Sequence, residues 1–203
     1  MSEQYFSAEP GSIDRRRDVT ASVWGQELRL QSSSGVFSDG RVDIGTAVLF
    51  RATGPQAATG TYLDLGCGYG VIACALAVAV PAASIWAVDV NERALRVCRD
   101  NAAGLGAADR VWMALPGEVP ADVVFDEIWS NPPIRIGKPA LHQVLRAWLP
   151  RLAPGGRAVF VVGKNLGADS LQRWIIEQGF ACHRLASAKG FRVLEARPLR
   201  AAE

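Results

Sequence analysis

The fold is decided by the stretch Asp64-Leu65-Gly66-Cys67-Gly68-Tyr69-Gly70, in which an apolar run ends in closely spaced glycines. Glycines let the backbone turn tightly and approach a ligand closely, because a Cβ atom would block both. A segment with helical periodicity follows directly. In an open α/β sheet, ligands bind at such turns, at the carboxyl ends of the strands where the strand order reverses. The stretch therefore predicts a strand, a ligand-binding turn and a helix.

Outward from this stretch, short Val, Ile, Leu and Trp runs alternate with helix-period segments, which is typical of a parallel sheet covered by helices. We expect strands at 62–65, 84–89, 110–114, 125–130, 157–162, 180–186 and 191–197. We expect helices at 70–80, 91–105, 140–152 and 169–178. The last two strands are too close for a parallel crossover, so they form an antiparallel hairpin at a sheet edge. The predicted fold is an α/β, doubly wound, seven-stranded Rossmann-like sheet with its last strand antiparallel.

The first 60 residues have a different pattern. Two short alternating segments, 19–24 and 27–31, predict a β-hairpin, and a Ser/Gly-rich stretch follows at 31–40. We expect residues 1–60 to form an N-terminal extension and residues 61–203 to form the main domain.

Length and composition favour a single soluble domain, since 203 residues with 49% hydrophobic and 21% charged side chains are ordinary for one. The longest apolar run is shorter than the roughly 18 residues that a membrane span needs. The N-terminus lacks the pattern of a secretory signal, so we expect a cytoplasmic protein that does not bind a membrane. The four cysteines show no metal-ligand spacing, and we expect neither a disulfide nor a metal ion.

Charge is distributed unevenly along the chain. Residues 131–203 carry 12 Lys and Arg against 4 Asp and Glu, whereas residues 1–130 carry 10 against 16. A basic third of a protein favours a polyanionic partner, although a solvated basic face gives the same pattern.

Two carboxylates indicate which cofactor would bind the glycine turn. Asp89 ends the second predicted strand, where a carboxylate can accept hydrogen bonds from a ribose diol. A nicotinamide dinucleotide would use the pattern G-x-G-x-x-G, but Val71 occupies the place of the third glycine. Asp64 suits the ammonium group of an amino-acid moiety better than a pyrophosphate. These features favour S-adenosylmethionine over NAD, with a turn that has only a structural role as the alternative.

The candidate catalytic loop is Asn131-Pro132-Pro133-Ile134, which follows the fourth strand of the predicted sheet. Prolines stiffen the turn and fix the directions of the Asn131 amide and the Pro132 carbonyl, both of which are hydrogen-bond acceptors. An amine conjugated to a π system is a poor nucleophile, and two oriented acceptors can align it for in-line attack on a sulfonium methyl group. Asn131, Pro132 and Pro133 are therefore the catalytic candidates, with an ordinary turn as the alternative.

The chain resembles the class I methyltransferases, and more narrowly the small-domain family related to bacterial 16S rRNA guanine-N2 methyltransferases and their stand-alone single-domain relatives. The glycine stretch is common to many methyltransferases, whereas the run Asn131-Pro132-Pro133-Ile134-Arg135-Ile136-Gly137-Lys138 is more specific. The other motifs that carry the resemblance are Tyr5-Phe6-Ser7, Gly35-Val36-Phe37-Ser38, Asp43-Ile44-Gly45, Asp89-Val90-Asn91-Glu92-Arg93-Ala94 and Lys189-Gly190-Phe191-Arg192-Val193-Leu194.

The resemblance implies a set of site residues and identifies 61–203 as a methyltransferase domain. Segments 35–38 and 43–45 would close over the cofactor. The positions implied for S-adenosyl-L-methionine are Asp64, Gly66, Gly68, Gly70, Asp89, Val90, Phe37 and Asn131. Substrate contacts are expected at Ile134, which stands where many relatives have an aromatic residue, and at the basic side chains Arg135, Lys138 and Arg192.

The leading hypothesis is an enzyme that methylates the exocyclic N2 of a guanine in small-subunit ribosomal RNA. Its expected partners are ribosomal RNA or the small ribosomal subunit, and we expect a monomer. A second hypothesis keeps the cofactor and changes the acceptor to a protein glutamine or to adenine N6. A third is a binding module for S-adenosylmethionine that has no catalytic activity.

Overall fold

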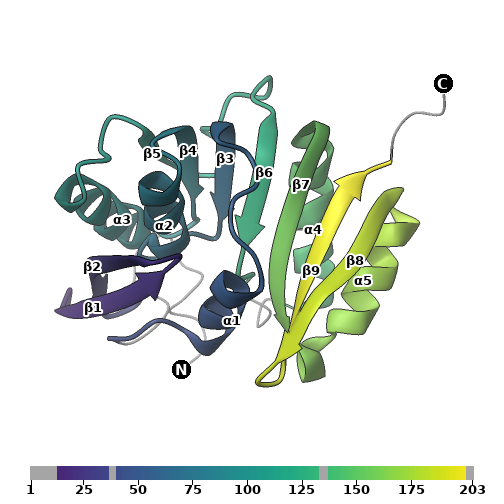
Figure 1. The fold of residues 1–203 in the computed structure, drawn as a ribbon, viewed down its shortest axis with the longest axis horizontal. Coiled ribbons are helices and arrows are strands. Elements are labelled where there is room, and N and C mark those ends of the chain that lie inside the picture. The colour runs from purple at the N-terminus through teal and green to yellow at the C-terminus, as the bar shows by residue number, and fades with distance from the viewer. Residues whose placement is uncertain (1–12, 37–39, 133–136, 200–203) are drawn as a thin grey trace.

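The computed structural model describes residues 13–36, 40–132 and 137–199 and contains one large sheet flanked by helices (Figure 1). The described strands of this sheet lie in the order β5-β4-β3-β6-β7-β9-β8. Their bounds are β3 Thr59–Leu65, β4 Ala82–Val88, β5 Val111–Ala114, β6 Phe125–Ser130, β7 Leu152–Gly163, β8 Phe180–Ala188 and β9 Phe191–Pro198.

The strand order confirms the predicted doubly wound sheet. β3 pairs in parallel with β4 on one side and with β6 on the other. Successive strands are added on one side of β3 up to β5 and on its other side from β6 onward, so the strand order reverses between β3 and β6. β9 pairs antiparallel with both β7 and β8, which confirms the antiparallel last strand. The closing hairpin forms the sheet edge, with β8 outermost and β9 inserted beside β7.

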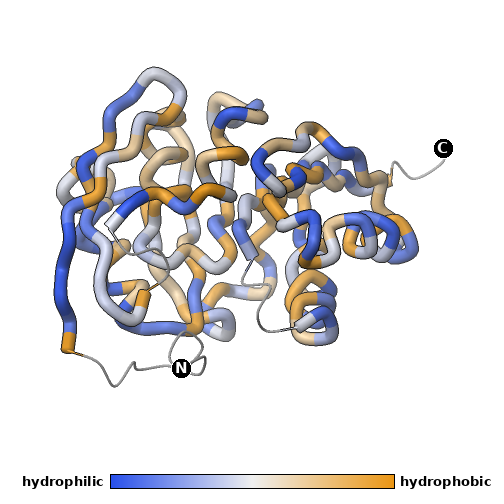
Figure 2. The backbone as a smooth tube through the Cα atoms, turned by 90° about the horizontal axis from the view of Figure 1, so that it is seen from below, coloured by the Kyte–Doolittle hydropathy of each residue, from blue (hydrophilic) through white to orange (hydrophobic). Residues whose placement is uncertain are grey.

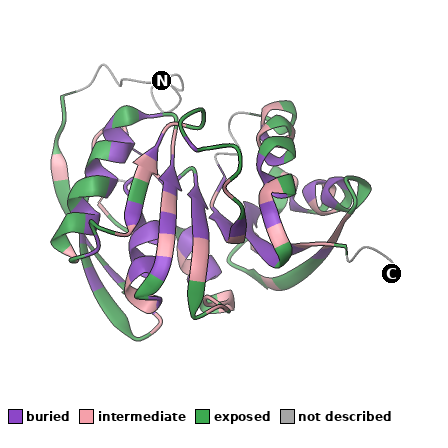
Figure 3. Cartoon of the chain, turned by 90° about the horizontal axis from the view of Figure 1, so that it is seen from above, coloured by how far each residue is buried: buried purple, intermediate pink, exposed green. Residues whose placement is uncertain are grey.

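Helices cover both faces of the sheet, and each face has its own buried core. Residues of α1, α2 and α3 share one core, and residues of α4 and α5 share the other. The strands between the two layers are largely buried in Figure 3, and both hydrophobic and hydrophilic residues lie along α4 and α5 in Figure 2. The bounds are α1 Ile44–Ala52, α2 Val71–Ala79, α3 Glu92–Gly104, α4 Lys138–Trp148 and α5 Ala168–Glu177.

The N-terminal hairpin is present as predicted, with β1 at Arg16–Val23 and β2 at Gln26–Ser33. Its inward side chains are buried in the same core as α2 and α3. Asn101 of α3 fastens it there, because its Nδ2 donates to the carbonyls of Gln31 and Tyr69, each at 2.8 Å. The hairpin is thereby connected to the glycine turn.

One helix was missing from the sequence-based prediction. Residues 44–52, assigned there to an extension without a helix, form α1. Five of its nine residues are buried, including Val48, Leu49 and Phe50, so the segment lacks the apolar and polar alternation that reveals a surface helix. The predicted helix 140–152 is also shorter, since α4 ends at Trp148 and a 3₁₀ turn follows.

Three further findings concern the described residues as a group. No helix among them is long and apolar enough to cross a membrane. No group of three or more His, Cys, Asp or Glu side chains in these ranges is arranged to hold a metal ion. Cys67, Cys74, Cys98 and Cys182 are buried free thiols.

Candidate active site

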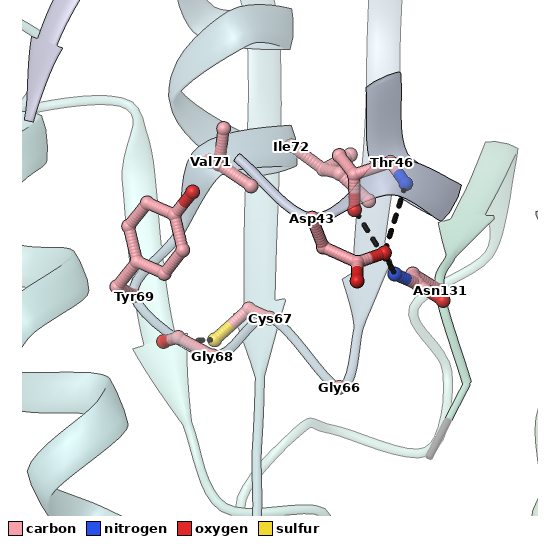
Figure 4. A pocket seen from close by; sticks show the side chains of 9 residues that line it. All are labelled: Asp43, Thr46, Gly66, Cys67, Gly68, Tyr69, Val71, Ile72 and Asn131. Atoms are coloured by element: carbon pink, nitrogen blue, oxygen red, sulfur yellow. Dashed lines mark hydrogen bonds between the residues drawn. The ribbon is translucent and has the colours of Figure 1, made fainter. Parts of the chain in front are cut away.

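A small hollow lies at the carboxyl ends of β3 and β6, where the order of the strands reverses. The glycine turn forms one side and the end of β6 forms another, while the start of α1 closes it from above in Figure 4. The lining residues are Asp43, Thr46, Gly66, Cys67, Gly68, Tyr69, Val71, Ile72 and Asn131.

The glycine turn has a backbone that only glycine adopts easily. Gly66, Gly68 and Gly70 have φ values of 76°, 55° and 84°. The N–H groups of Gly66 and Cys67 donate to the carbonyl of Val88 at 2.8 and 3.0 Å, which fixes the turn against β4. A Cβ atom on Gly70 would overlap the Cys98 thiol. The turn is therefore a rigid cradle rather than a flexible loop.

Asp64 lies fully buried beneath this cradle. Its Oδ2 accepts a hydrogen bond from the N–H of Ala73 at 2.9 Å, and its Oδ1 has no partner among the described residues. Burial raises the pKa of Asp64 to about 7, against the opposing effect of the Ala73 hydrogen bond. A buried carboxylate oxygen without a partner is costly unless a donor reaches it. A donor group of a bound ligand would satisfy this oxygen, but Asp64 itself is not one of the residues that line the hollow.

Asp89 follows β4 and braces the turn from the other side. Its Oδ2 accepts from the N–H of Gly68 at 2.9 Å, and its Oδ1 accepts from the N–H of Asn91 at 2.9 Å. Burial raises the pKa of Asp89, against the effect of these backbone hydrogen bonds. A carboxylate offers about four acceptor positions, so ribose hydroxyls could share it. The neighbouring Val90 is 46% exposed and is available for an apolar contact.

Asn131 is brought to the hollow by the end of β6. The Ser130 hydroxyl donates to the Leu65 carbonyl at 2.6 Å, which joins the two strand ends. The Nδ2 of Asn131 donates to Asp43 Oδ2 at 2.9 Å and to Thr46 Oγ1 at 3.0 Å (Figure 4). The adjoining Pro132 is buried. The amide nitrogen of Asn131 is thus engaged, which leaves the carbonyl oxygen as the acceptor available to a substrate.

Asp43 and Thr46 belong to the start of α1. Asp43 is the N-cap residue, and its Oδ2 accepts from the N–H groups of Gly45 and Thr46 at 2.8 and 3.2 Å. The resemblance to methyltransferases placed Asp43 near the cofactor, but Thr46 was not singled out. The N-cap pattern of Asp43 before an apolar run was the available sequence signal for this helix.

The predicted substrate residues are only partly described. Lys138 is exposed at the start of α4. Arg192 is buried on β9 and forms an ion pair with Asp169, so a contact with phosphate stays a prediction that would require this pair to open. The remaining predicted site residues lie outside the described ranges: Phe37, Pro133, Ile134 and Arg135.

Comparison with solved structures supports the fold. The chain is similar to the Thermus thermophilus 16S rRNA N2 G1207 methyltransferase, solved in complex with AdoMet and guanosine, with a TM-score of 0.77 and 24% identity. The match covers 94% of this chain and 52% of that protein.

Two proteins found by their sequences are also similar to this chain. An uncharacterized protein of Bacillus subtilis is 30% identical over 97% of this chain and 99% of its own length. The ribosomal RNA small subunit methyltransferase C of Pseudomonas aeruginosa is 36% identical over 84% of this chain. This chain spans 51% of that protein, about half its length.

A family model decides the assignment. Residues 27–195 match the model of the methyltransferase small domain. This range includes the glycine turn, Asp89, Asn131 and the start of α1, all of which surround or adjoin the hollow. The chain therefore belongs to the methyltransferase small domain family.

Proposed function

We propose that this protein uses S-adenosylmethionine to methylate the exocyclic N2 of a guanine in small-subunit ribosomal RNA. The observation that carries the proposal is the arrangement of the hollow, in which the glycine turn and the Asn131 amide face one space. A cofactor held by the turn would thus lie beside an oriented acceptor for the substrate. Transfer of a methyl group from the cofactor to the substrate amine depends above all on the alignment of the two reacting groups.

The residues present fit the cofactor. The partnerless Asp64 Oδ1 would hold the ammonium group, and Asp89 would hold the ribose hydroxyls while it braces Gly68. The glycine turn leaves room for a close approach of the ligand. When bound, S-adenosylmethionine would supply a methyl group to the amine nitrogen, and the electron pair of the broken carbon–sulfur bond would stay on sulfur.

The protein's own part in the reaction is to orient the amine. The Asn131 Oδ1 and the Pro132 carbonyl would accept its two N–H bonds, which directs the nitrogen lone pair toward the methyl group. The surplus proton on the methylated amine would leave to water. This chemistry serves any planar exocyclic amine, so the choice of guanine rests on further grounds.

Guanine in ribosomal RNA is favoured by the similar proteins and by charge. The Pseudomonas aeruginosa relative is a small-subunit ribosomal RNA methyltransferase, and the Thermus thermophilus protein is an N2 guanine methyltransferase. The basic balance of residues 131–203 suits a polyanionic substrate. Mass spectrometry of ribosomal RNA nucleosides from cells with and without the gene tests the proposal. A methylated guanosine should disappear in the deletion, and an unchanged nucleoside profile would contradict the assignment.

Three further predictions complete this proposal. Residues 1–60 would act as a cofactor-covering extension of the methyltransferase domain at 61–203, supported by the contribution of Asp43 and Thr46 to the hollow. The protein would act as a monomer. A ribosomal RNA substrate would place it in the cytoplasm.

Cofactor affinity should depend on pH through Asp64. Below pH 7 the carboxyl is largely protonated, because its pKa is about 7. A bound ammonium group favours the ionised form, so binding must release this proton at low pH. The dissociation constant of S-adenosylhomocysteine should therefore fall by up to about tenfold per pH unit from pH 5 to pH 7. Calorimetry in buffers of different ionisation enthalpy measures both the affinity and the proton release.

The control for this titration is Asp64→Asn, which should bind more weakly at pH 7 and lose most of the pH dependence, with Asp89, whose pKa burial also raises, contributing what remains. Neither His142, whose ring stacks on Trp174 at a centroid distance of 4.1 Å, nor His183 on the edge strand β8 lines the hollow. Equal pH profiles for the two proteins would place the ammonium group elsewhere.

RNA affinity should depend on the basic side chains that follow the catalytic loop. If Arg135 and Lys138 neutralise two phosphates, replacing both by alanine should flatten the slope of log K against log salt by roughly 1.4 to 1.8 units. Arg99 of α3 and Arg173 of α5 are exposed and serve as the control pair. RNA binding over a salt series distinguishes the pairs, and equal slopes for wild type and the Arg135/Lys138 variant would rule out both phosphate contacts.

A further inference from the structure

We propose that Asp43 and Thr46 are positioning residues that hold the Asn131 amide in the one orientation that accepts a hydrogen bond from the substrate amine. This inference rests on the proposed transfer to a planar amine and adds two residues that act through Asn131. Asp43 would also polarise the amide. Neither side chain needs to touch the reacting atoms.

The hydrogen bonds leave the amide one stable orientation. The two acceptors around Nδ2 are Asp43 Oδ2 at 2.9 Å and Thr46 Oγ1 at 3.0 Å. An amide nitrogen has two N–H donors, and a carboxylate can only accept. Rotating the amide by half a turn would place its oxygen against the Asp43 carboxylate, with repulsion in place of a charge-assisted hydrogen bond. Oδ1 of Asn131 is therefore directed away from both partners.

The Asp43 carboxylate is itself held firmly. Its Oδ2 accepts from the backbone N–H groups of Gly45 and Thr46 in addition to Asn131. A Cβ atom on Gly45 would lie 2.9 Å from that oxygen and 2.9 Å from the ring of Phe191. The Asp43 carboxylate and the Phe191 ring therefore both lie close to Gly45, which is possible because glycine has no Cβ atom. Burial of Thr46, at 3% exposure, likewise restricts its hydroxyl.

The charge of Asp43 has a further effect on the amide. Hydrogen bonds in a chain polarise one another, so a carboxylate that accepts from Nδ2 increases the negative charge on Oδ1. That oxygen becomes a better acceptor for an N–H bond of the substrate. The amine nitrogen gains positive charge as it attacks, and a preorganised negative charge one amide away stabilises this state more than the ground state. The contribution should therefore fall on kcat.

If Asp43 served only to cap α1, a variant that keeps the cap should keep the methylation rate. Serine is about as good an N-cap as aspartate, so Asp43→Ser should keep α1 capped while it loses the charge and the reach to Asn131. Thr46→Val is close in shape and removes only the hydroxyl. Thr46→Ser restores the hydroxyl. These variants separate the positioning of Asn131 from the stability of the helix.

The experiment measures single-turnover methylation of ribosomal RNA, cofactor affinity and thermal unfolding for each variant. Asp43→Ser should lower the rate about 10-fold to 100-fold, and Thr46→Val should lower it about threefold to tenfold. Thr46→Ser should recover most of that loss. The rates are compared at saturating S-adenosylmethionine, so that any change in cofactor affinity does not enter them, and the unfolding temperature should change little.

A double-mutant cycle with Asn131→Ala makes the decision. If Asp43 acts through Asn131, adding Asp43→Ser to Asn131→Ala should cost no more than about twofold, since the residues work as a unit. Fully multiplicative losses, or an undiminished rate in both Asp43→Ser and Thr46→Val, would overturn the positioning role. If Asp43→Ser fails to fold, the corresponding cycle with Thr46→Val decides the question. A wild-type protein that methylates no RNA would instead refute the proposed function.

Discussion

Asn131→Ala is expected to lower kcat by about 100-fold or more, which is the loss measured when one preorganised polar group is removed from other active sites. The variant keeps Asp43 as the cap of α1, because the hydrogen bonds from Gly45 and Thr46 do not involve Asn131. Folding and cofactor binding should therefore be nearly unchanged. Steady-state kinetics, with calorimetry for S-adenosylhomocysteine, measures the two effects separately.

Three outcomes of this substitution are informative. A large fall in kcat with the same cofactor affinity supports a role for Asn131 toward the substrate amine. Wild-type turnover by a folded Asn131→Ala protein would refute the catalytic mechanism. A fall that is confined to cofactor affinity would make Asn131 a cofactor ligand only.

Arg157→Leu is expected to have the largest effect on stability, lowering the free energy of unfolding by about 3–5 kcal/mol. Arg157 is 1% exposed and lies between two carboxylates. Its Nη2 is 2.9 Å from Glu127 Oε2, and its Nη1 is 3.1 Å from Glu195 Oε2. Leucine would leave both carboxylates buried without this cation. For a domain of this size, the unfolding temperature should fall by roughly 6–20 °C.

The pH dependence of this effect identifies its cause. Burial raises the pKa of Glu195, but hydrogen bonds from Arg197 and Arg157 outweigh burial and keep the pKa below its usual value. Losing Arg157 should raise that pKa, so the destabilisation should be smaller at pH 5 than at pH 8. Denaturant unfolding at both pH values measures the difference.

Two control variants support this interpretation. Glu127→Gln, combined with Arg157→Leu, should recover part of the loss because it removes one uncompensated charge. Arg173→Leu, on an exposed part of α5, should change the stability little. A pH-independent loss with no recovery in the double variant would point to packing in place of charge.

The sequence around the glycine stretch predicted most of the fold because its apolar periodicity and its glycines indicate the same elements. The period of the apolar residues switches from strand to helix at Gly70, which is the N-cap of α2 in the structure. The same logic placed β6 at its observed bounds. Apart from α1, the principal differences were at the ends of elements, such as β7, which begins at Leu152 instead of residue 157.

The candidate site was harder to predict, because its contacts join distant parts of the chain. Asn131 and Asp43 are 88 positions apart, and no local pattern reveals that a capping carboxylate also orients an amide from β6. Arg192 could be read as a basic substrate residue, but its ion pair with Asp169 depends on how β9 and α5 pack. The division at residue 60 and the role of Phe37 stay predictions.

Direct methylation of ribosomal RNA by the purified protein tests the central claim most directly. Small subunits and naked small-subunit RNA from cells that lack the gene would be incubated with methyl-labelled S-adenosylmethionine and digested to nucleosides. Label should appear in N2-methylguanosine with the wild-type protein and fall at least about 100-fold in rate with Asn131→Ala. Label in N6-methyladenosine, in ribosomal protein or in no product would contradict the claim.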